Sequence, residues 1–195
     1  MGNPPAGSPG VDESVRWVCR HSMKKIILLR HAKSSWQDPS LDDHDRPLNA
    51  RGRGAAPIIG DWLAHRNHLP DTVLCSSARR TRQTVKGLRK AIPSLPEARI
   101  EEPLYHASPG TMLERLRGLP VECQTVLLVG HQPGLGTLTR MLSDGRESRR
   151  CRRAFEHFPT AAAAVLDVDI ADWADLAYGI AHFVDFAKPR ELMDA

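Results

Sequence analysis

The sequence predicts one α/β domain with three layers, in which helices cover both faces of a mostly parallel central sheet. Its 195 residues suffice for a single domain with a full core, but two large domains would need a longer chain. Short apolar runs of strand length alternate with helical patterns along the chain, as is typical of a parallel sheet. No run approaches the roughly 20 consecutive apolar residues that are needed to cross a bilayer, so we do not expect this chain to be an integral membrane protein.

Four segments are expected to form strands. Residues 25–29 (KIILL), 72–75 (TVLC) and 125–129 (TVLLV) are continuously apolar or nearly so, as is typical of strands buried on both faces. Residues 161–169 (AAAAVLDVD) are a weaker candidate, because apolar and polar residues alternate only toward the end of the segment.

The stretches between these strands carry helical patterns. A first helix is indicated by apolar residues that share one face, namely Ile58, Ile59, Trp62 and Leu63. Residues 78–91 are polar but helical in pattern, with Val85 and Leu88 expected to face inward. Ser108 supplies a capping hydroxyl before Pro109, which predicts a helix that ends near residue 117. Pro133 can open a further helix, which would carry Leu135, Leu138, Met141 and Leu142.

The first 22 residues differ in character from the rest of the chain. They are polar, begin with a stretch rich in proline and glycine, and contain no apolar core of a secretory signal. At Met23 the pattern changes to that of a first buried strand. We therefore expect residues 1–22 to be a disordered extension and residues 23–195 to form the domain, with Met23 as an alternative start.

Charge and cysteine content favour a cytoplasmic protein that does not bind nucleic acid. The formal net charge is only +4. The arginine-rich segment 146–153 lacks interleaved aromatic residues. We expect a solvated loop there, or as an alternative a docking place for a phosphorylated partner. The four cysteines lie far apart, without a C-x-x-C pair, which indicates reduced thiols rather than a metal or disulfide framework.

Cations gather where three of the expected strands end. The first strand is followed by Arg30 and His31, the second by Arg79 and Arg80, and the third by His131. In open α/β sheets, ligands bind at the ends of strands where helices begin. Guanidinium and imidazole groups at helix N-termini suit a phosphoryl group. The sequence therefore predicts a site for phosphate chemistry, and we expect neither a metal nor an organic cofactor.

Three motifs carry these residues, in the same order along the chain. They are RHAKSSW at 30–36, SSARRTRQT at 76–84 and VGHQPG at 129–134. Together they resemble the histidine phosphatase (phosphoglycerate mutase-like) superfamily, and most closely its small SixA-type branch. The resemblance extends over residues 23–192, nearly the whole expected domain, and implies a phosphoglycerate mutase-like fold.

The resemblance also implies roles for individual residues. His31 would be the nucleophile that forms a covalent phosphohistidine, which water then hydrolyses. The phosphoryl group would be held by Arg30, Arg80 and His131, whose charges would also lower the pKa of His31. Three further candidates are Gln37, Ser34 and Glu102. In the family, the place of Gln37 usually holds an asparagine that touches phosphate. Ser34 would lie at the rim of the site, and Glu102 would be the general acid.

The substrate expectation rests on the same resemblance and on one spacing. Only 51 residues separate Arg80 from His131 (131 − 80), which leaves little room for a helical lid. An open site favours hydrolysis over a mutase reaction that must retain its intermediate. We expect a monomer that acts on phosphohistidine of a protein. The alternatives are a phosphatase of a small organic phosphomonoester and a non-catalytic phosphate-binding module.

A cysteine phosphatase is the competing enzyme class. Its signature needs an arginine six positions after the nucleophilic cysteine, and Cys75 has Thr81 at that position. Arginines stand on either side of the required place, so we keep this alternative for comparison with the structure.

Overall fold

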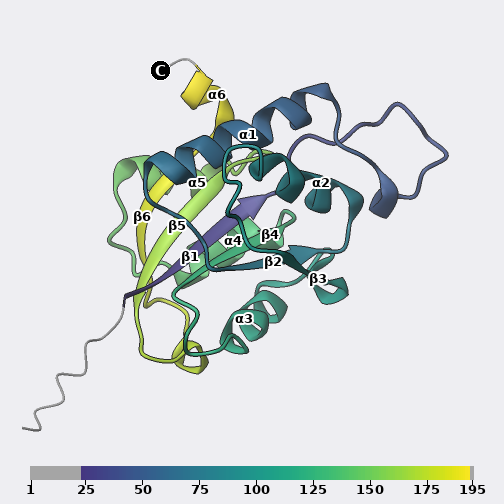
Figure 1. Ribbon diagram of the computed structural model, residues 1–195. Helices are drawn as coiled ribbons and strands as arrows, with labels where there is room; N and C mark the ends of the chain where they lie inside the picture. The colour runs from purple at the N-terminus through teal and green to yellow at the C-terminus, as the bar shows by residue number, and fades with distance from the viewer. Residues whose placement is uncertain (1–22, 194–195) are drawn as a thin grey trace, which may run out of the picture.

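The computed structural model describes residues 23–193, which form a six-stranded sheet with helices on both faces (Figure 1). The strands are β1 (Met23–Arg30), β2 (Thr72–Ser76), β3 (Ala98–Glu101), β4 (Thr125–Gly130), β5 (Ala163–Asp169) and β6 (His182–Ala187). They lie in the order β3-β2-β4-β1-β5-β6. The first four pair in parallel, whereas β5 and β6 are antiparallel to their neighbours. This confirms the predicted α/β fold with its mostly parallel sheet.

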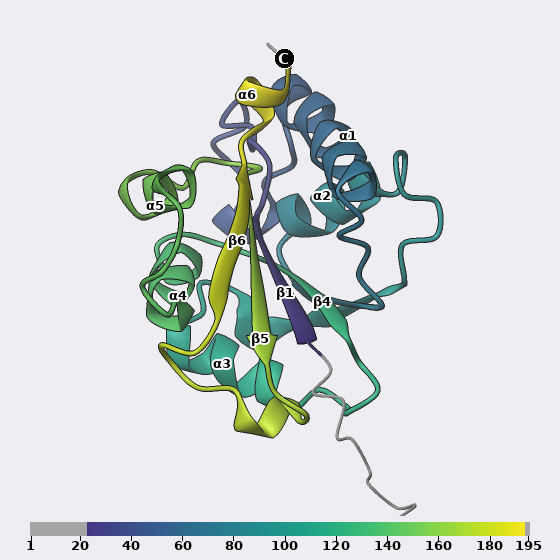
Figure 2. The same cartoon turned by 90° about the vertical axis from the view of Figure 1, so that its left-hand side faces the viewer.

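Helices form the two outer layers. They are α1 (Ala50–His65), α2 (Arg79–Leu88), α3 (Pro109–Arg117), α4 (Gly134–Leu142), α5 (Arg149–Glu156) and α6 (Pro189–Met193). Three short 3-10 helices accompany them, η1 (Asp43–Asp45), η2 (Glu102–Leu104) and η3 (Trp173–Asp175). Figure 2 shows α1 and α2 on one face of the sheet and α3, α4 and α5 on the other.

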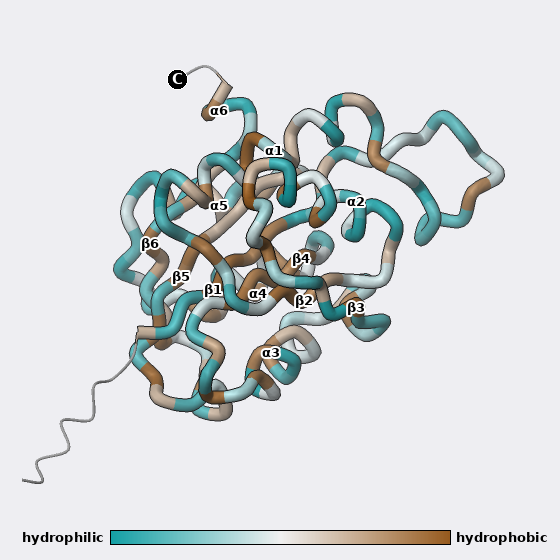
Figure 3. The backbone as a smooth tube through the Cα atoms, viewed as in Figure 1, coloured by the Kyte–Doolittle hydropathy of each residue, from teal (hydrophilic) through white to brown (hydrophobic). Residues whose placement is uncertain are grey.

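The core consists of two apolar clusters, one on each face of the sheet. Successive residues of β1 alternate between them, because side chains of a strand point to opposite faces. Ile26 and Leu28 pack with α3 and α4, while Ile27 and Leu29 pack with α1 and α2. Figure 3 shows this apolar content along the central strands. Burying one such side chain fully contributes about 1.5–3 kcal/mol.

Helix ends follow their sequence signals. The hydroxyl of Ser108 caps α3 by accepting a hydrogen bond from the amide of Thr111, as predicted. Asn49 caps α1 in the same way, through the amide of Gly52. A Cβ atom at Gly52 would lie 2.2 Å from the carbonyl oxygen of Lys33. Glycine therefore lets the first turn of α1 pack directly on the segment that follows β1.

Two strands, β3 and β6, and two helices, α5 and α6, were not predicted. β3 is a short edge strand with two exposed residues, and the exposed residues of β6 interrupt any apolar run. The prediction of a loop in the arginine-rich segment is wrong, because residues 149–156 form α5 with Ser148 as its cap. The expected disorder of residues 1–22 lies outside the described residues. No helix within 23–193 is long and apolar enough to span a membrane.

Candidate active site

The pairing of β1 with β4 brings the two motif histidines together. Arg30 lies opposite Gly130 in this parallel pair. The residues that follow the two strands, His31 and His131, therefore emerge at the same edge of the sheet. Their ring centroids lie 5.2 Å apart. A pocket of about 230 Å³ opens there, lined by Arg30, His31, Lys33, Ser34, Trp36, Asp43, Arg46, Arg80, His106, His131, Gln132 and Thr160.

His31 has the protonation state that a nucleophile needs. Its Nδ1 lies 2.8 Å from the carbonyl oxygen of Ala32, and since a carbonyl only accepts, Nδ1 carries the proton. The lone pair is therefore on Nε2. Burial lowers the pKa of His31 to about 4, against the hydrogen bond to Ala32, and the charges of Arg80 and Arg30 lower it further. The like charges expected from the sequence thus contribute less than burial.

His131 is also neutral. A guanidinium nitrogen of Arg80 lies 3.3 Å from its Nδ1, which must accept. Its Nε2 then carries the proton and donates to the hydroxyl of Ser76 at 2.8 Å. Burial lowers the pKa of His131 to about 2, and the neighbouring His31 and Arg80 contribute. Donation from His131 to a phosphoryl oxygen stays a prediction.

The two motif arginines reach the pocket from different elements. Arg30 ends β1, and one of its terminal nitrogens donates to the carbonyl of Phe158 at 2.9 Å. Its Nε is buried without a partner among residues 23–193. Arg80 lies in the first turn of α2 and is only 3% exposed. Buried guanidinium groups keep their charge, so the pocket is strongly cationic.

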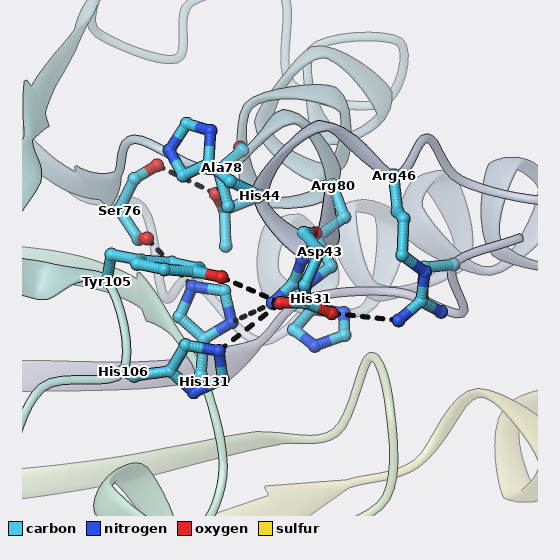
Figure 4. Close-up of polar contacts among 12 residues, drawn as sticks. His31, Asp43, His44, Arg46, Ser76, Ala78, Arg80, Tyr105, His106 and His131 are labelled. Carbon is cyan, nitrogen blue, oxygen red and sulfur yellow. Dashed lines mark hydrogen bonds and ion pairs between the residues drawn. The ribbon is translucent and has the colours of Figure 1, made fainter. Parts of the chain in front are cut away.

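A carboxylate that was not predicted occupies this cationic pocket. Asp43 of η1 accepts hydrogen bonds at 2.8 Å from Arg80, Arg46 and the hydroxyl of Tyr105, and at 3.3 Å from His106 (Figure 4). Partial burial opposes ionisation, but the hydrogen bonds from Tyr105, His106 and Arg80 hold the pKa of Asp43 well below its usual range. The pocket thus already binds an anion supplied by its own loop.

Sequence reasoning missed most of the residues around this carboxylate. Tyr105 and His106 follow η2, and the ring of His106 stacks on His131 with centroids 5.1 Å apart. The backbone of His106 is left-handed, with φ of 49°, a conformation that costs a non-glycine residue about 1–2 kcal/mol. Arg46 lies in a segment that reads as a turn before α1. The sequence signal that could have indicated Asp43 and Arg46 is the charged stretch DDHDR at 42–46.

The three weaker candidates lie in different places. Ser34 lines the pocket, and its hydroxyl accepts from Arg46 at 3.0 Å. Gln37 is exposed and lies outside the pocket lining. Glu102 also lies outside the lining and accepts from the hydroxyl of Ser77 at 3.1 Å, and Ser77 in turn contacts His44. Of these three candidates, the structure therefore places only Ser34 beside the motif histidines and arginines.

Neither a cysteine nucleophile nor a metal site is supported by the side chains of the described residues. Cys75 is fully buried, and this burial raises the pKa of its thiol to about 12, whereas a nucleophilic cysteine needs a lowered pKa. Within the described part of the chain, no cluster of histidine, cysteine, aspartate or glutamate side chains is arranged to hold a metal ion.

Both site histidines are expected to stay neutral at acidic pH. In a short peptide a histidine titrates near pH 6.5, about as in an unfolded chain. Here the ring nitrogens of His31 should keep their neutral signals in nitrogen NMR down to about pH 5, and protonate near pH 4. Since the folded pKa lies below the unfolded one, this group stabilises the fold above about pH 6.5, and the stabilisation decreases as the pH falls toward 4. Titration of His31 between about pH 6 and 7 would contradict this account.

A neutral buried imidazole beside a cationic pocket is the arrangement expected of one class of protein, the phosphatases that use a histidine nucleophile. A model of the histidine phosphatase superfamily (branch 1) matches residues 26–117. An uncharacterized protein of Mycobacterium tuberculosis is 42% identical over 166 residues, which cover 83% of this chain and all of that protein.

Solved structures agree with this class. A protein assigned as the phosphohistidine phosphatase SixA of Nakamurella multipartitia is 31% identical, with a TM-score of 0.73 over 86% of this chain and 96% of that chain. Another, assigned as SixA of Agrobacterium tumefaciens, is 33% identical, with a TM-score of 0.69 over 85% and 98% of the two chains. The chain belongs to the histidine phosphatase superfamily, in its SixA-type branch.

Removing the internal carboxylate should tighten the binding of inorganic phosphate. In Asp43→Asn, a phosphate dianion no longer competes with a carboxylate for Arg80 and Arg46, and we expect affinity to increase about tenfold. Calorimetric titration with inorganic phosphate measures this. Asp45→Asn is the matched control, since Asp45 is an exposed neighbour outside the pocket lining. Weaker binding by Asp43→Asn would instead make Asp43 a residue that positions the arginines.

Proposed function

We propose that this phosphatase hydrolyses phosphohistidine on a protein. The observation that carries the proposal is the absence of a protonated carboxyl group in the pocket as described. Asp43 is the only carboxyl group among the lining residues, and its lowered pKa keeps it ionised. Glu102 lies outside. An alkoxide leaving group needs a proton donor, which contributes about 10²–10⁴-fold, whereas imidazole leaves far more readily.

The reaction has two steps. In the first, Nε2 of His31 attacks phosphorus, so that a new P–N bond forms while the P–N bond to the substrate imidazole breaks. The imidazole nitrogen keeps the electron pair and takes a proton from water. In the second step, a water molecule attacks the phosphorus of phospho-His31. A P–O bond forms as the P–Nε2 bond breaks, the electron pair returns to Nε2, and the proton of the attacking water passes to solvent. Inorganic phosphate is released and the neutral imidazole is restored.

The remaining residues of the pocket hold the transferring group. The guanidiniums of Arg30 and Arg80 can each present forked donors to the equatorial oxygens. As the dianion enters, Arg80 exchanges its contact with Asp43 for one with phosphate. The hydrogen bond from Nδ1 of His31 to Ala32 keeps Nε2 aimed into the pocket throughout. The likeness to the two SixA proteins supports the same substrate class.

A substrate panel tests the proposal. We expect kcat/KM for a phosphohistidine peptide to exceed that for alkyl phosphates, such as phosphoserine and glycerol phosphate, by at least about a hundredfold. Release of inorganic phosphate at equal enzyme concentration gives the ratio. A matched phosphoserine peptide of otherwise identical sequence removes the contribution of peptide binding. Equal or faster hydrolysis of the phosphoserine peptide would overturn the phosphohistidine assignment.

A small organic phosphomonoester is the second candidate, favoured by one feature. The hydroxyl of Tyr105 and Nε2 of His106 both reach Asp43 at the pocket, so a proton donor for an alkoxide lies close by. In that case Tyr105→Phe would slow hydrolysis of an alkyl phosphate more than that of p-nitrophenyl phosphate, whose leaving group needs no proton.

The partner and setting follow from this substrate. We propose that the enzyme meets a phosphorylated protein in the cytoplasm. The three cysteines of the described chain, Cys75, Cys123 and Cys151, are buried free thiols, which supports a reducing compartment.

A further inference from the structure

We infer that the groove between α2 and β3 docks an extended acidic segment of the partner protein whose phosphohistidine enters the pocket. This inference names the partner class for the proposed function and rests on it. The groove has a volume of about 600 Å³ and lies outside the active-site pocket. Its walls are the outer side of α2, continued to Lys90, and the edge strand β3.

Positive charge dominates this groove. Four cations line it, Arg82, Lys86, Arg89 and Lys90, against the single carboxylate of Glu97. None of the four forms an ion pair with a carboxylate in the described chain. Three of the cations are exposed, and Arg89 is half-buried. Unpaired like charges close together repel one another, so an acidic ligand would relieve this repulsion.

The arginine-rich segment that stands out in the sequence behaves differently. On and around α5, four arginines each face a carboxylate: Arg146 with Asp144, Arg150 with Asp185, Arg152 with Glu147, and Arg153 with Glu191. Most of the charge of that segment is therefore matched within the fold. The cations beside β3 are unmatched, which makes the α2–β3 groove the better place for an acidic partner.

The other wall of the groove can accept a strand. β3 is the edge of the sheet, with β2 on one side and no strand of the described chain on the other. An exposed edge can pair with an extended segment through main-chain hydrogen bonds. Ala98 and Ile100 share the face that lines the groove, and Ile100 is 49% exposed. In a segment paired with β3, every other side chain would point to the α2 side of the sheet, so acidic residues at these alternate positions would face the cations of α2.

Both walls of the groove belong to elements that also reach the active site. The first turn of α2 supplies Arg80 to the pocket, and the chain leaving β3 supplies His106 to the pocket and Tyr105 to Asp43 at its side. From Arg80 to Lys90 the helical rise amounts to about 15 Å, which about five extended residues span. A phosphohistidine in the pocket and an acidic segment a few residues away can therefore bind at the same time.

Binding of unphosphorylated peptides tests the groove separately from catalysis. The probes are fluorescein-labelled peptides of alternating glutamate and valine, and of alternating lysine and valine. By fluorescence anisotropy, we expect the acidic peptide to bind and the basic one not to bind. The double variant Arg82→Gln/Lys86→Gln should weaken binding of the acidic peptide at least about tenfold. Arg149→Gln/Arg190→Gln removes the same charge at exposed sites outside the groove and should keep it.

Turnover links the groove to the proposed function. With a phosphohistidine peptide that carries the acidic extension, the groove variant should increase KM at least about tenfold and leave hydrolysis of p-nitrophenyl phosphate unchanged. Binding of the acidic peptide without any phosphohistidine hydrolysis still supports the groove and overturns only the proposed substrate. Equal binding of both peptides, or equal losses in the two double variants, would overturn the docking inference.

Discussion

The variant His31→Ala is expected to lose turnover of p-nitrophenyl phosphate and of any phosphohistidine peptide by at least about a thousandfold. The reason is the loss of a buried imidazole that combines a free lone pair on Nε2 with an orientation fixed by a hydrogen bond. Its Nδ1 is tied to the carbonyl of Ala32 and its pKa is about 4. His131 cannot substitute, because Arg80 and Ser76 engage both of its nitrogens. Initial rates over a range of enzyme concentrations measure the loss.

A matched control and a trapping experiment accompany this variant. His65 lies on the exposed side of α1, where its ring bonds to the carbonyl of Asp61, so His65→Ala should keep full activity. In the wild type, a rapid quench in base should trap a phosphoryl group on His31 that acid then removes, seen by mass spectrometry. A phosphoenzyme that still forms in His31→Ala would place the nucleophile elsewhere.

Replacing Arg80 should produce the second largest loss. We expect Arg80→Ala to decrease kcat/KM about 100- to 1,000-fold, because one preorganised donor to the transferring group disappears. Arg80→Lys should restore little, since an ammonium group lacks the planar fork that Arg80 directs at both Asp43 and His131. Steady-state kinetics with p-nitrophenyl phosphate give kcat and KM separately. A loss confined to KM would assign Arg80 to binding alone.

Arg79 provides the control for this substitution. It precedes Arg80 in the first turn of α2 but is exposed, and its side chain donates to the carbonyl of Asp45 over a long distance of 3.5 Å. Arg79→Ala therefore removes the same charge beside the pocket without removing a donor from it. If both variants lost activity equally, general electrostatic attraction rather than the geometry of Arg80 would be responsible.

Asp43 connects these results to the resting state of the enzyme. Its carboxylate holds Arg80 and Arg46 in place where a phosphoryl group is expected to bind. Arginines that close together would repel one another in an empty pocket, and the carboxylate offsets this. In the proposed mechanism, substrate binding then exchanges one anion for another. The groove between α2 and β3 carries cations without such a partner, which is why we assign it to a ligand from outside.

Much of the fold could be read from local patterns. The continuous apolar runs of β1, β2 and β4, the cap of α3 at Ser108 and the inward face of α2 depend on neighbouring residues alone. β3 and β6 escaped notice because their burial is set by position in the sheet. One is an edge with two exposed residues, and the other alternates irregularly. α5 escaped because its arginines are balanced by carboxylates from distant parts of the chain, such as Asp185 and Glu191.

The sequence by itself determined the fold class and the motifs that carry His31, Arg30, Arg80 and His131, because strand ends in a parallel sheet meet at one edge. Only the tertiary structure decided which nitrogen of His31 is free and that burial, more than charge, keeps it neutral. It also brought Asp43 into the pocket from η1, with Tyr105 bonded to it. The physical reason is that hydrogen-bond partners and desolvation arise between segments far apart in the chain, where local patterns carry no information.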